Sequence, residues 1–210
     1  MDKSLSEKQK EFIKIWKLAH KKYASNNKRL AGEGWQKDWQ LLITTMLSAQ
    51  SRDEITIPVA EELFNKYKTL KQIANAPEDE IKNKIKKINY NISKARHIKK
   101  TANILLKEHD GKVPRTIHEL IKLPGVGIKT ANLVATQLYG IDAICVDTHV
   151  HRIANVFEFV KTKTPQQTEK ELQIIIPKKY WSQINRIFVL WGQDVKGRSP
   201  EKFLEKLNEK

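Results

Sequence analysis

The feature that most constrains this chain is a short LPGVG turn at residues 123–127, which separates two helical patterns. Its proline ends any helix that precedes it, and its glycines accept positive φ and let another group approach the backbone closely. After the turn, apolar residues recur at a helical period over 128–138, and Gly140 stands where a C-terminal cap is expected. Before the turn, Thr116 is a candidate N-cap. We therefore predict a helix, a glycine hairpin and a second helix over about 116–140.

The start of the second helix is a candidate site for an anion. Free N–H groups and the positive end of the helix dipole both attract phosphate there. Lys129 lies in the first turn, where the dipole disfavours an ammonium, and the neutral amine is the nucleophilic form of lysine. A carboxylate, Asp147, follows in the sequence VDTH.

Charge and composition favour a polyanionic partner. The chain has 210 residues with 39 Lys and Arg against 24 Asp and Glu, giving a net charge of +15. No apolar run approaches the roughly 20 residues of a membrane-spanning helix. The first residues lack the apolar segment of a secretory signal, so we expect a cytoplasmic protein, associated with the nucleoid if it is prokaryotic.

Cysteine and histidine usage argues against a metal centre. Cys145 is the only cysteine, which excludes an internal disulfide and an all-cysteine metal site. The six histidines are scattered without ligand spacing.

The rest of the chain also shows helical periodicity. Apolar residues at helical spacing over 7–24 and 39–50 predict two helices, and 25–36 is a connection. Ser51 or Asp53 is expected to cap the next helix, with Pro58 in its first turn. Ser199 and the proline after it predict a last capped helix. No strand alternation is present, so we predict an all-α protein.

A basic segment occupies residues 81–107. It contains nine Lys and Arg and no acidic residue, and two short helices are predicted on either side of 89–92. A lysine run is often only a solvated face. Beside a hairpin of the phosphate-binding type, this run favours a track for the DNA backbone.

These motifs together resemble a known family. LPGVGxKTAN followed by VDTH is similar to the helix-hairpin-helix (HhH-GPD) DNA glycosylases, specifically the endonuclease III branch, and 41–50 resembles that branch's LLxxxLLSAQ segment. The resemblance implies two helical domains with a DNA-binding cleft between them. A barrel-like domain at 31–141 would carry the hairpin, and 1–30 with 142–210 would form the second domain, which carries the catalytic aspartate.

The resemblance also implies a reaction. Lys129 matches the family's nucleophile, whose amine attacks C1′, displaces the base and leaves a Schiff base that permits β-elimination. Asp147 matches the carboxylate that stabilises charge on the sugar or accepts a proton. Relatives that only remove the base usually lack this lysine. We therefore expect a bifunctional DNA glycosylase and AP lyase that acts on an oxidised pyrimidine.

Reaching C1′ requires the nucleotide to flip out of the duplex. Gln50 matches the residue that fills the resulting gap, and Tyr90 aligns with an apolar wedge. The expected DNA-binding residues are Ser48, Gln50, Tyr90, Gly125, Val126, Gly127, Lys129, Thr130 and His149.

Two other functions remain open. One is a glycosylase for uracil or thymine in mismatches, which pocket residues would decide. The other is a non-catalytic helix-hairpin-helix DNA-binding module, although such a module needs neither Lys129 nor Asp147. Asp147 can also cap the next helix, and both roles are compatible. We expect a monomer that binds double-stranded DNA with a damaged or mismatched base.

The resemblance fails at the C-terminus. Relatives typically end in a four-cysteine loop that holds an iron-sulfur cluster, whereas 191–199 contains no cysteine, so we expect no such cluster. Lys196, Arg198 and Lys202 are hypothesised to replace the basic residues of that loop. A potassium or sodium ion on the hairpin carbonyls is compatible with the resemblance, and no other cofactor is expected.

Overall fold

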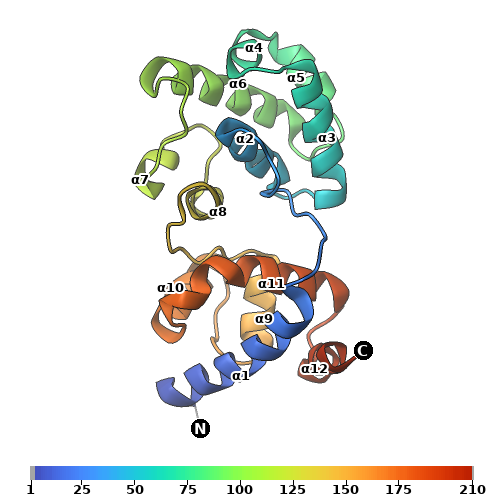
Figure 1. Ribbon diagram of the computed structural model, residues 1–210, viewed down its shortest axis with the longest axis vertical. Helices are drawn as coiled ribbons and strands as arrows, with labels where there is room; N and C mark the ends of the chain where they lie inside the picture. Colours follow the sequence, from blue (N-terminus) through green and yellow to red (C-terminus); the bar gives the residue numbers. More distant parts are fainter. Residues whose placement is uncertain (1–2, 210) are drawn as a thin grey trace. The chain divides into compact units, whose positions relative to one another are not determined.

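The computed structural model describes residues 3–209, and those residues form helices joined by turns, with no strand (Figure 1). The all-α prediction is confirmed. The chain divides into a central unit, Arg29–Ile141, and a terminal unit made of Met1–Lys28 and Asp142–Lys210. Among the described residues, no helix combines the length and apolar composition that a membrane span requires.

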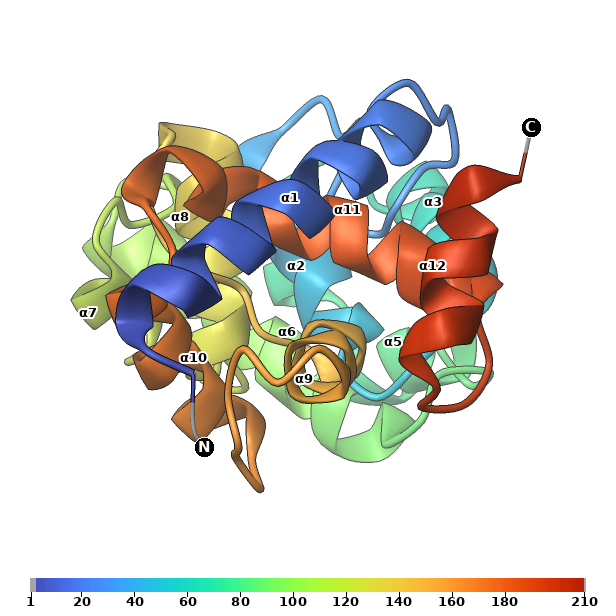
Figure 2. The same ribbon diagram turned by 90° about the horizontal axis from the view of Figure 1, so that it is seen from below.

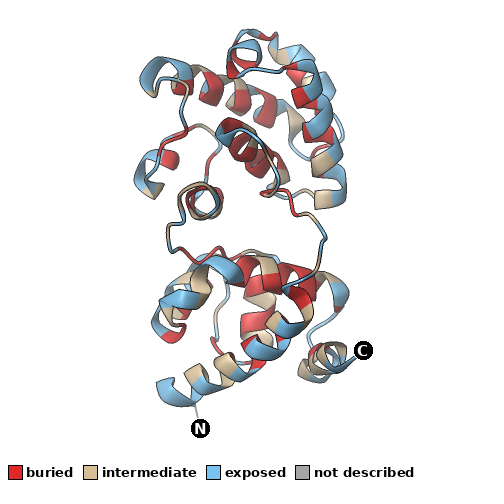
Figure 3. Ribbon diagram, viewed as in Figure 1, coloured by how far each residue is buried: buried red, intermediate tan, exposed pale blue. Residues whose placement is uncertain are grey.

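The central unit packs its helices around one apolar core. Leu42, Ile43 and Leu47 of the second helix are fully buried in it. The inward faces of the helices are buried and the outward faces exposed (Figure 3). The helices of this unit are α2 (Asp38–Ser48), α3 (Asp53–Lys66), α4 (Leu70–Asn75), α5 (Glu78–Lys84), α6 (Asn91–Glu108), α7 (Ile117–Leu120) and α8 (Ile128–Tyr139).

The longest of these helices, α6, organises the central unit. It packs against α2, α4 and α5. Its buried stripe includes Ala95, Ile98, Ala102 and Leu105 at helical spacing. Elements that are distant in sequence therefore rest on one helix.

The terminal unit is built around aromatic side chains. Trp191 lies with its ring centroid 5.1 Å from Phe203 and 5.4 Å from Phe157. α1 crosses α11 and contacts it (Figure 2). The elements of this unit are α1 (Leu5–Tyr23), α9 (Thr148–Val156), α10 (Pro165–Ile175), the 3₁₀ turn η1 (Lys178–Tyr180), α11 (Trp181–Asp194) and α12 (Pro200–Asn208).

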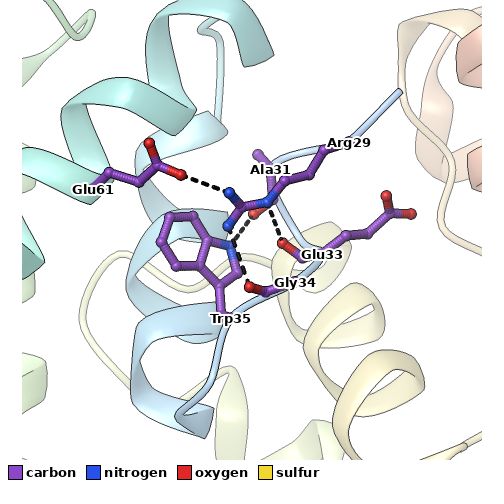
Figure 4. Close-up of polar contacts among 6 residues, drawn as sticks. All are labelled: Arg29, Ala31, Glu33, Gly34, Trp35 and Glu61. Carbon is purple, nitrogen blue, oxygen red and sulfur yellow. Dashed lines mark hydrogen bonds and ion pairs between the residues drawn. The ribbon is translucent and has the colours of Figure 1, made fainter. Parts of the chain in front are cut away.

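The connection over 25–36 is more structured than expected. Arg29 donates from Nε to Glu33 O at 2.8 Å and from Nη1 to Glu61 Oε1 at 2.6 Å (Figure 4). Its guanidinium also lies 4.3 Å from the ring centroid of Trp35, whose Nε1 donates to Ala31 O at 2.6 Å. These contacts attach the start of the central unit to α3.

Three expectations about helices were wrong. The N-cap of α3 is Arg52, with Asp53 already inside the helix, so neither Ser51 nor Asp53 caps it. Pro58 lies inside α3 rather than in its first turn. The helix that follows Tyr90 is not short, because α6 has 18 residues. The expected caps Thr116, Gly140 and Ser199 are all present.

Candidate active site and DNA-contacting turns

The two glycines of the hairpin have different structural roles. Gly125 has φ +78°, and a Cβ there would lie 2.8 Å from Cβ and Nδ1 of His97. Gly127 has φ −88°, and a Cβ there would meet nothing within 4 Å. The fold therefore needs glycine at 125 but not at 127, where the open space leaves room for an approaching ligand.

The helix that follows the hairpin begins without a side-chain cap. Gly127 is the N-cap of α8, and no described side chain accepts a hydrogen bond from the first N–H groups of this helix. Val126 is buried, and its N–H donates to Leu123 O at 3.1 Å. Thr130 is buried as well, so its side chain does not face solvent.

Lys129 lies in the first turn of this uncapped helix. Its side chain is half-buried. No hydrogen-bond or ion-pair partner is recorded for Nζ among residues 3–209. An amine that is positioned by a helix but not paired is suited to attack an external electrophile.

Gln50 is presented on a strained turn after α2. It has φ +57° and is exposed. Ser48, two residues earlier, donates from Oγ to Thr45 O at 2.9 Å and is partly buried. A non-glycine residue in the left-handed region persists only where its surroundings hold it there.

Tyr90 shares this property. It has φ +60°, is the N-cap of α6, and leaves 65% of its surface exposed. Asn89 joins the two turns, because its Nδ2 donates to Gln50 O at 2.5 Å and its N–H donates to Ser51 Oγ at 3.3 Å. The structure therefore joins the turn that carries Gln50 to the residue directly before Tyr90.

Asp147 belongs to the terminal unit and caps α9. Its Oδ1 accepts the N–H groups of His149 and Val150, each at 2.9 Å. No donor to its second oxygen, Oδ2, is recorded within residues 3–209. The capping role expected of Asp147 is therefore present, and it leaves one carboxylate oxygen unused.

His149 is held by packing as well as by this cap. A Cβ on Gly192 of α11 would lie 2.5 Å from Nδ1 of His149, so the imidazole occupies the space that glycine leaves. This contact was not predictable from sequence, because His149 and Gly192 are far apart along the chain.

The basic segment at 81–107 is not one continuous cationic track. Lys94 is buried and Lys99 is partly buried, and both donate to backbone carbonyls. Lys82 pairs with Asp79 at 2.5 Å, and Arg96 pairs with Glu78 at 3.4 Å. The remaining members are exposed and available to a backbone phosphate; these are Lys84, Lys86, Lys87, Lys100 and Lys107.

The residues present do not fit an iron-sulfur cluster. The single cysteine, Cys145, is buried, and one thiolate cannot replace the four that such a cluster needs. Among residues 3–209, no group of three or more His, Cys, Asp and Glu is arranged to hold a metal ion.

Comparison with known proteins places these features in a family. Residues 43–178 match the HhH-GPD superfamily of base excision DNA repair proteins. The chain belongs to this superfamily. It is 40% identical over 157 residues to endonuclease III of Thermotoga maritima, covering 75% of this chain and 74% of that protein. It is 37% identical to the mouse endonuclease III-like protein 1, of which it spans 53%.

Solved structures agree with this assignment. The chain matches a trapped endonuclease III-DNA covalent intermediate with a TM-score of 0.84 at 34% identity, covering 92% of this chain and 90% of that one. A thermostable thymine-DNA glycosylase shares the fold at 22% identity. The predicted resemblance to endonuclease III, a DNA glycosylase with AP lyase activity, is confirmed at the level of the family.

Proposed function

We propose that this HhH-GPD protein excises an oxidised pyrimidine from double-stranded DNA and then cleaves the strand, with Lys129 as nucleophile. The observation that carries this proposal is the unpaired Lys129 amine at the start of the uncapped helix α8. A relative with 34% identity is described as a covalent intermediate with DNA, which supports covalent chemistry here.

The reaction divides into two balanced steps. In the first, the neutral amine of Lys129 forms a bond to C1′, and the bond from C1′ to the base breaks, so that the base leaves with the electron pair and is protonated. The attached nitrogen then loses a proton, and its lone pair forms a double bond to C1′ as the bond from C1′ to the ring oxygen breaks. That oxygen keeps the electron pair and is protonated, which leaves a Schiff base. In the second, a base removes the 2′ proton, the electron pair of that C–H bond forms a double bond between C2′ and C3′, and the 3′ phosphate leaves with the electron pair of its C–O bond. Water then hydrolyses the Schiff base and frees Lys129.

Asp147 is suited to assist the first step. We assign its Oδ2, which accepts no recorded bond in the described chain, to stabilising positive charge on the sugar or accepting a proton from the amine. Because Oδ1 is fixed by two backbone N–H groups, the carboxylate has one orientation available.

The central unit supplies the contacts that hold DNA. We assign backbone phosphate to the open N–H groups at Gly127 and the start of α8. Gln50 and Tyr90 are assigned to the gap that the flipped nucleotide leaves, and the hydrogen bond to Gln50 O from Asn89, the residue before Tyr90, favours this pairing. We expect the protein to act as a monomer.

Borohydride trapping tests the proposal. Duplexes that carry thymine glycol, uracil opposite guanine, or an abasic site are incubated with the wild type and Lys129→Ala. We expect the wild type to form a trapped adduct that the alanine variant does not form. We expect base release to be fastest from thymine glycol. Base release without an adduct would overturn the Schiff-base route, and strongest release of uracil would favour the mismatch function.

A further inference from the structure

One face of α6 contacts each of the turns assigned to DNA. Lys94, His97 and Thr101 lie at helical spacing i, i+3 and i+7. Thr101 Oγ1 donates to Pro124 O at 3.0 Å, and His97 packs against Gly125. Both residues therefore support the hairpin, while Lys94 supports the turn that carries Gln50.

Lys94 makes two hydrogen bonds at the end of α2. Its Nζ donates to Leu47 O at 2.7 Å and to Ala49 O at 2.6 Å. Carbonyl groups in the last turn of a helix have no partner within that helix, and a cation is favoured at this end of the dipole. Lys94 is only 8% exposed, and its bond to Leu47 O is buried.

The two carbonyls lie just before Gln50 in the chain. Ala49 is the C-cap of α2, with ψ 118°, and the chain then enters the left-handed conformation of Gln50. Asn89 holds the next carbonyl, that of Gln50 itself. The carbonyls of 47 and 49 are therefore bonded by Lys94 of α6, and that of 50 by Asn89, just before α6.

We infer that Lys94 is a positioning residue, which holds Gln50 in its left-handed conformation so that its side chain can fill the gap left by a flipped nucleotide. This inference rests on the proposed function of Gln50. Lys94 is itself not a candidate nucleophile, because its amine is enclosed and bonded to two carbonyls.

The same helix offers a matched control. Lys99 Nζ donates to Ala76 O at 2.7 Å, and Ala76 is the C-cap of α4. Lys99→Met thus removes one lysine charge and one bond to a helix-end carbonyl, away from the Gln50 turn, whereas Lys94→Met removes one charge and two such bonds. A general effect of charge or of α6 stability would appear in both variants.

The test compares duplex and single-stranded DNA. Each carries one abasic site, and the rate of borohydride-trapped adduct is measured for each variant. Single-stranded DNA has no partner strand and hence no gap to fill. We expect Lys94→Met to lower the ratio of the duplex rate to the single-strand rate roughly 10- to 100-fold, because small misplacements near a reacting group cost that much. Lys99→Met is expected to keep the wild-type ratio.

Two further variants distinguish a positioning role of Lys94 from a purely structural one. Lys94→Arg retains donors but lengthens the side chain, so it should lower the ratio by less while the protein stays folded. Gln50→Gly removes the side chain and accepts φ +57°. In that background, Lys94→Met should cause no further fall in the ratio, because the two residues act through one interaction.

The outcomes separate the inference from the proposed function. A wild type that forms no adduct on either DNA overturns the proposed function and the inference with it. Adducts with an unchanged ratio in Lys94→Met and Lys94→Arg overturn the inference alone. The inference is also overturned if Lys94→Met lowers the adduct rate equally on duplex and single-stranded DNA, because Lys94 is then only structural. The same conclusion follows if Lys94→Met lowers the ratio as much in the Gln50→Gly background as in the wild type.

Discussion

At the scale of single residues, Asp147 makes a structural contact and is proposed to make a chemical one. Oδ1 accepts two N–H groups of α9, and Oδ2 is the oxygen assigned to the sugar. Asparagine can make the same cap but carries no charge, whereas alanine can make neither contact. The two substitutions therefore separate the roles.

We expect Asp147→Asn to fold with a free energy of unfolding within about 1 kcal/mol of the wild type, because the cap is kept and only a charge at the helix end is lost. Base release should fall roughly 100- to 10,000-fold. Asp147→Ala should show a similar loss of activity and about 1 kcal/mol of destabilisation. Urea denaturation and single-turnover base release measure these effects. Wild-type activity in Asp147→Asn would exclude the chemical role.

Burial of Lys94 makes the stability of the protein depend on pH. Burial lowers the pKa of Lys94 to about 8 from the 10.5 of an exposed lysine. Between these values the unfolded chain binds more protons than the native one, so this lysine's contribution to stability rises with pH. Below pH 8 both states hold the proton, and the full cost of burying the charge remains.

We therefore predict that the difference in free energy of unfolding between wild type and Lys94→Met moves in favour of the wild type as pH rises from about 8 to 10.5. Urea denaturation at several pH values measures it, and the subtraction cancels other lysines and tyrosines. Lys99→Met serves as the parallel control. A difference that stays level or falls with pH would contradict this prediction.

At the scale of elements, the hairpin separates what the fold needs from what a ligand needs. We expect Gly125→Ala to lower the free energy of unfolding by roughly 1–3 kcal/mol, because alanine disfavours φ +78° and its Cβ would overlap His97. Gly127→Ala should change stability by less than about 0.5 kcal/mol, since its Cβ meets open space. The same Cβ should weaken DNA binding about tenfold, or about 1.4 kcal/mol.

Urea denaturation and fluorescence anisotropy with a labelled abasic duplex distinguish the two glycines. If Gly127→Ala unfolds as easily as Gly125→Ala, position 127 is required by the fold itself. If it binds DNA as the wild type does, the open N–H groups of α8 are not the phosphate contact.

The elements that local sequence determines were predicted well. Thr116, Gly140 and Ser199 mark helix ends through contacts within a few residues of themselves, and all three occur as expected. The role of Lys94 was not predictable, because its partner Leu47 is 47 residues away and nothing in a run of lysines singles out one member. The short helix α4 was also missed, since its six residues are too few for a periodic pattern.

The C-terminal segment shows how one element is held without cysteine ligands. Arg152 of α9 donates from Nη2 to Gly192 O at 2.5 Å and to Val195 O at 2.9 Å, and from Nη1 to Gly197 O at 3.2 Å. Its guanidinium also lies 5.3 Å from the ring centroid of Phe203. These contacts fix the turn between α11 and α12.

At the scale of the whole molecule, a net charge of +15 favours DNA over most other partners, but only part of it is available. Buried Lys94 and the ion-paired residues Lys82 and Arg96 do not serve as free phosphate contacts. The slope of log K against log salt concentration reports how many phosphates the protein neutralises, because each neutralised phosphate releases counterions.

Lys196, Arg198 and Lys202 are the last basic residues to test in this way. All three are exposed beside the turn that Arg152 holds by its carbonyls, so their side chains are not needed to fix it. We expect the triple alanine variant to keep its fold. A plot of log K against log salt concentration should become shallower by about 0.9 for each lost contact, or about 2.7 for three.

The matched control removes the same charge from another exposed face, by alanine substitution of Lys10, Lys14 and Lys17 on α1. Anisotropy titrations with duplex DNA at several salt concentrations provide both slopes. If the three C-terminal residues contact phosphate, their slope changes while that of the α1 variant does not, because counterion release depends on contacts rather than on net charge. Equal slopes in both variants and the wild type would show that this segment does not replace a DNA-contacting loop.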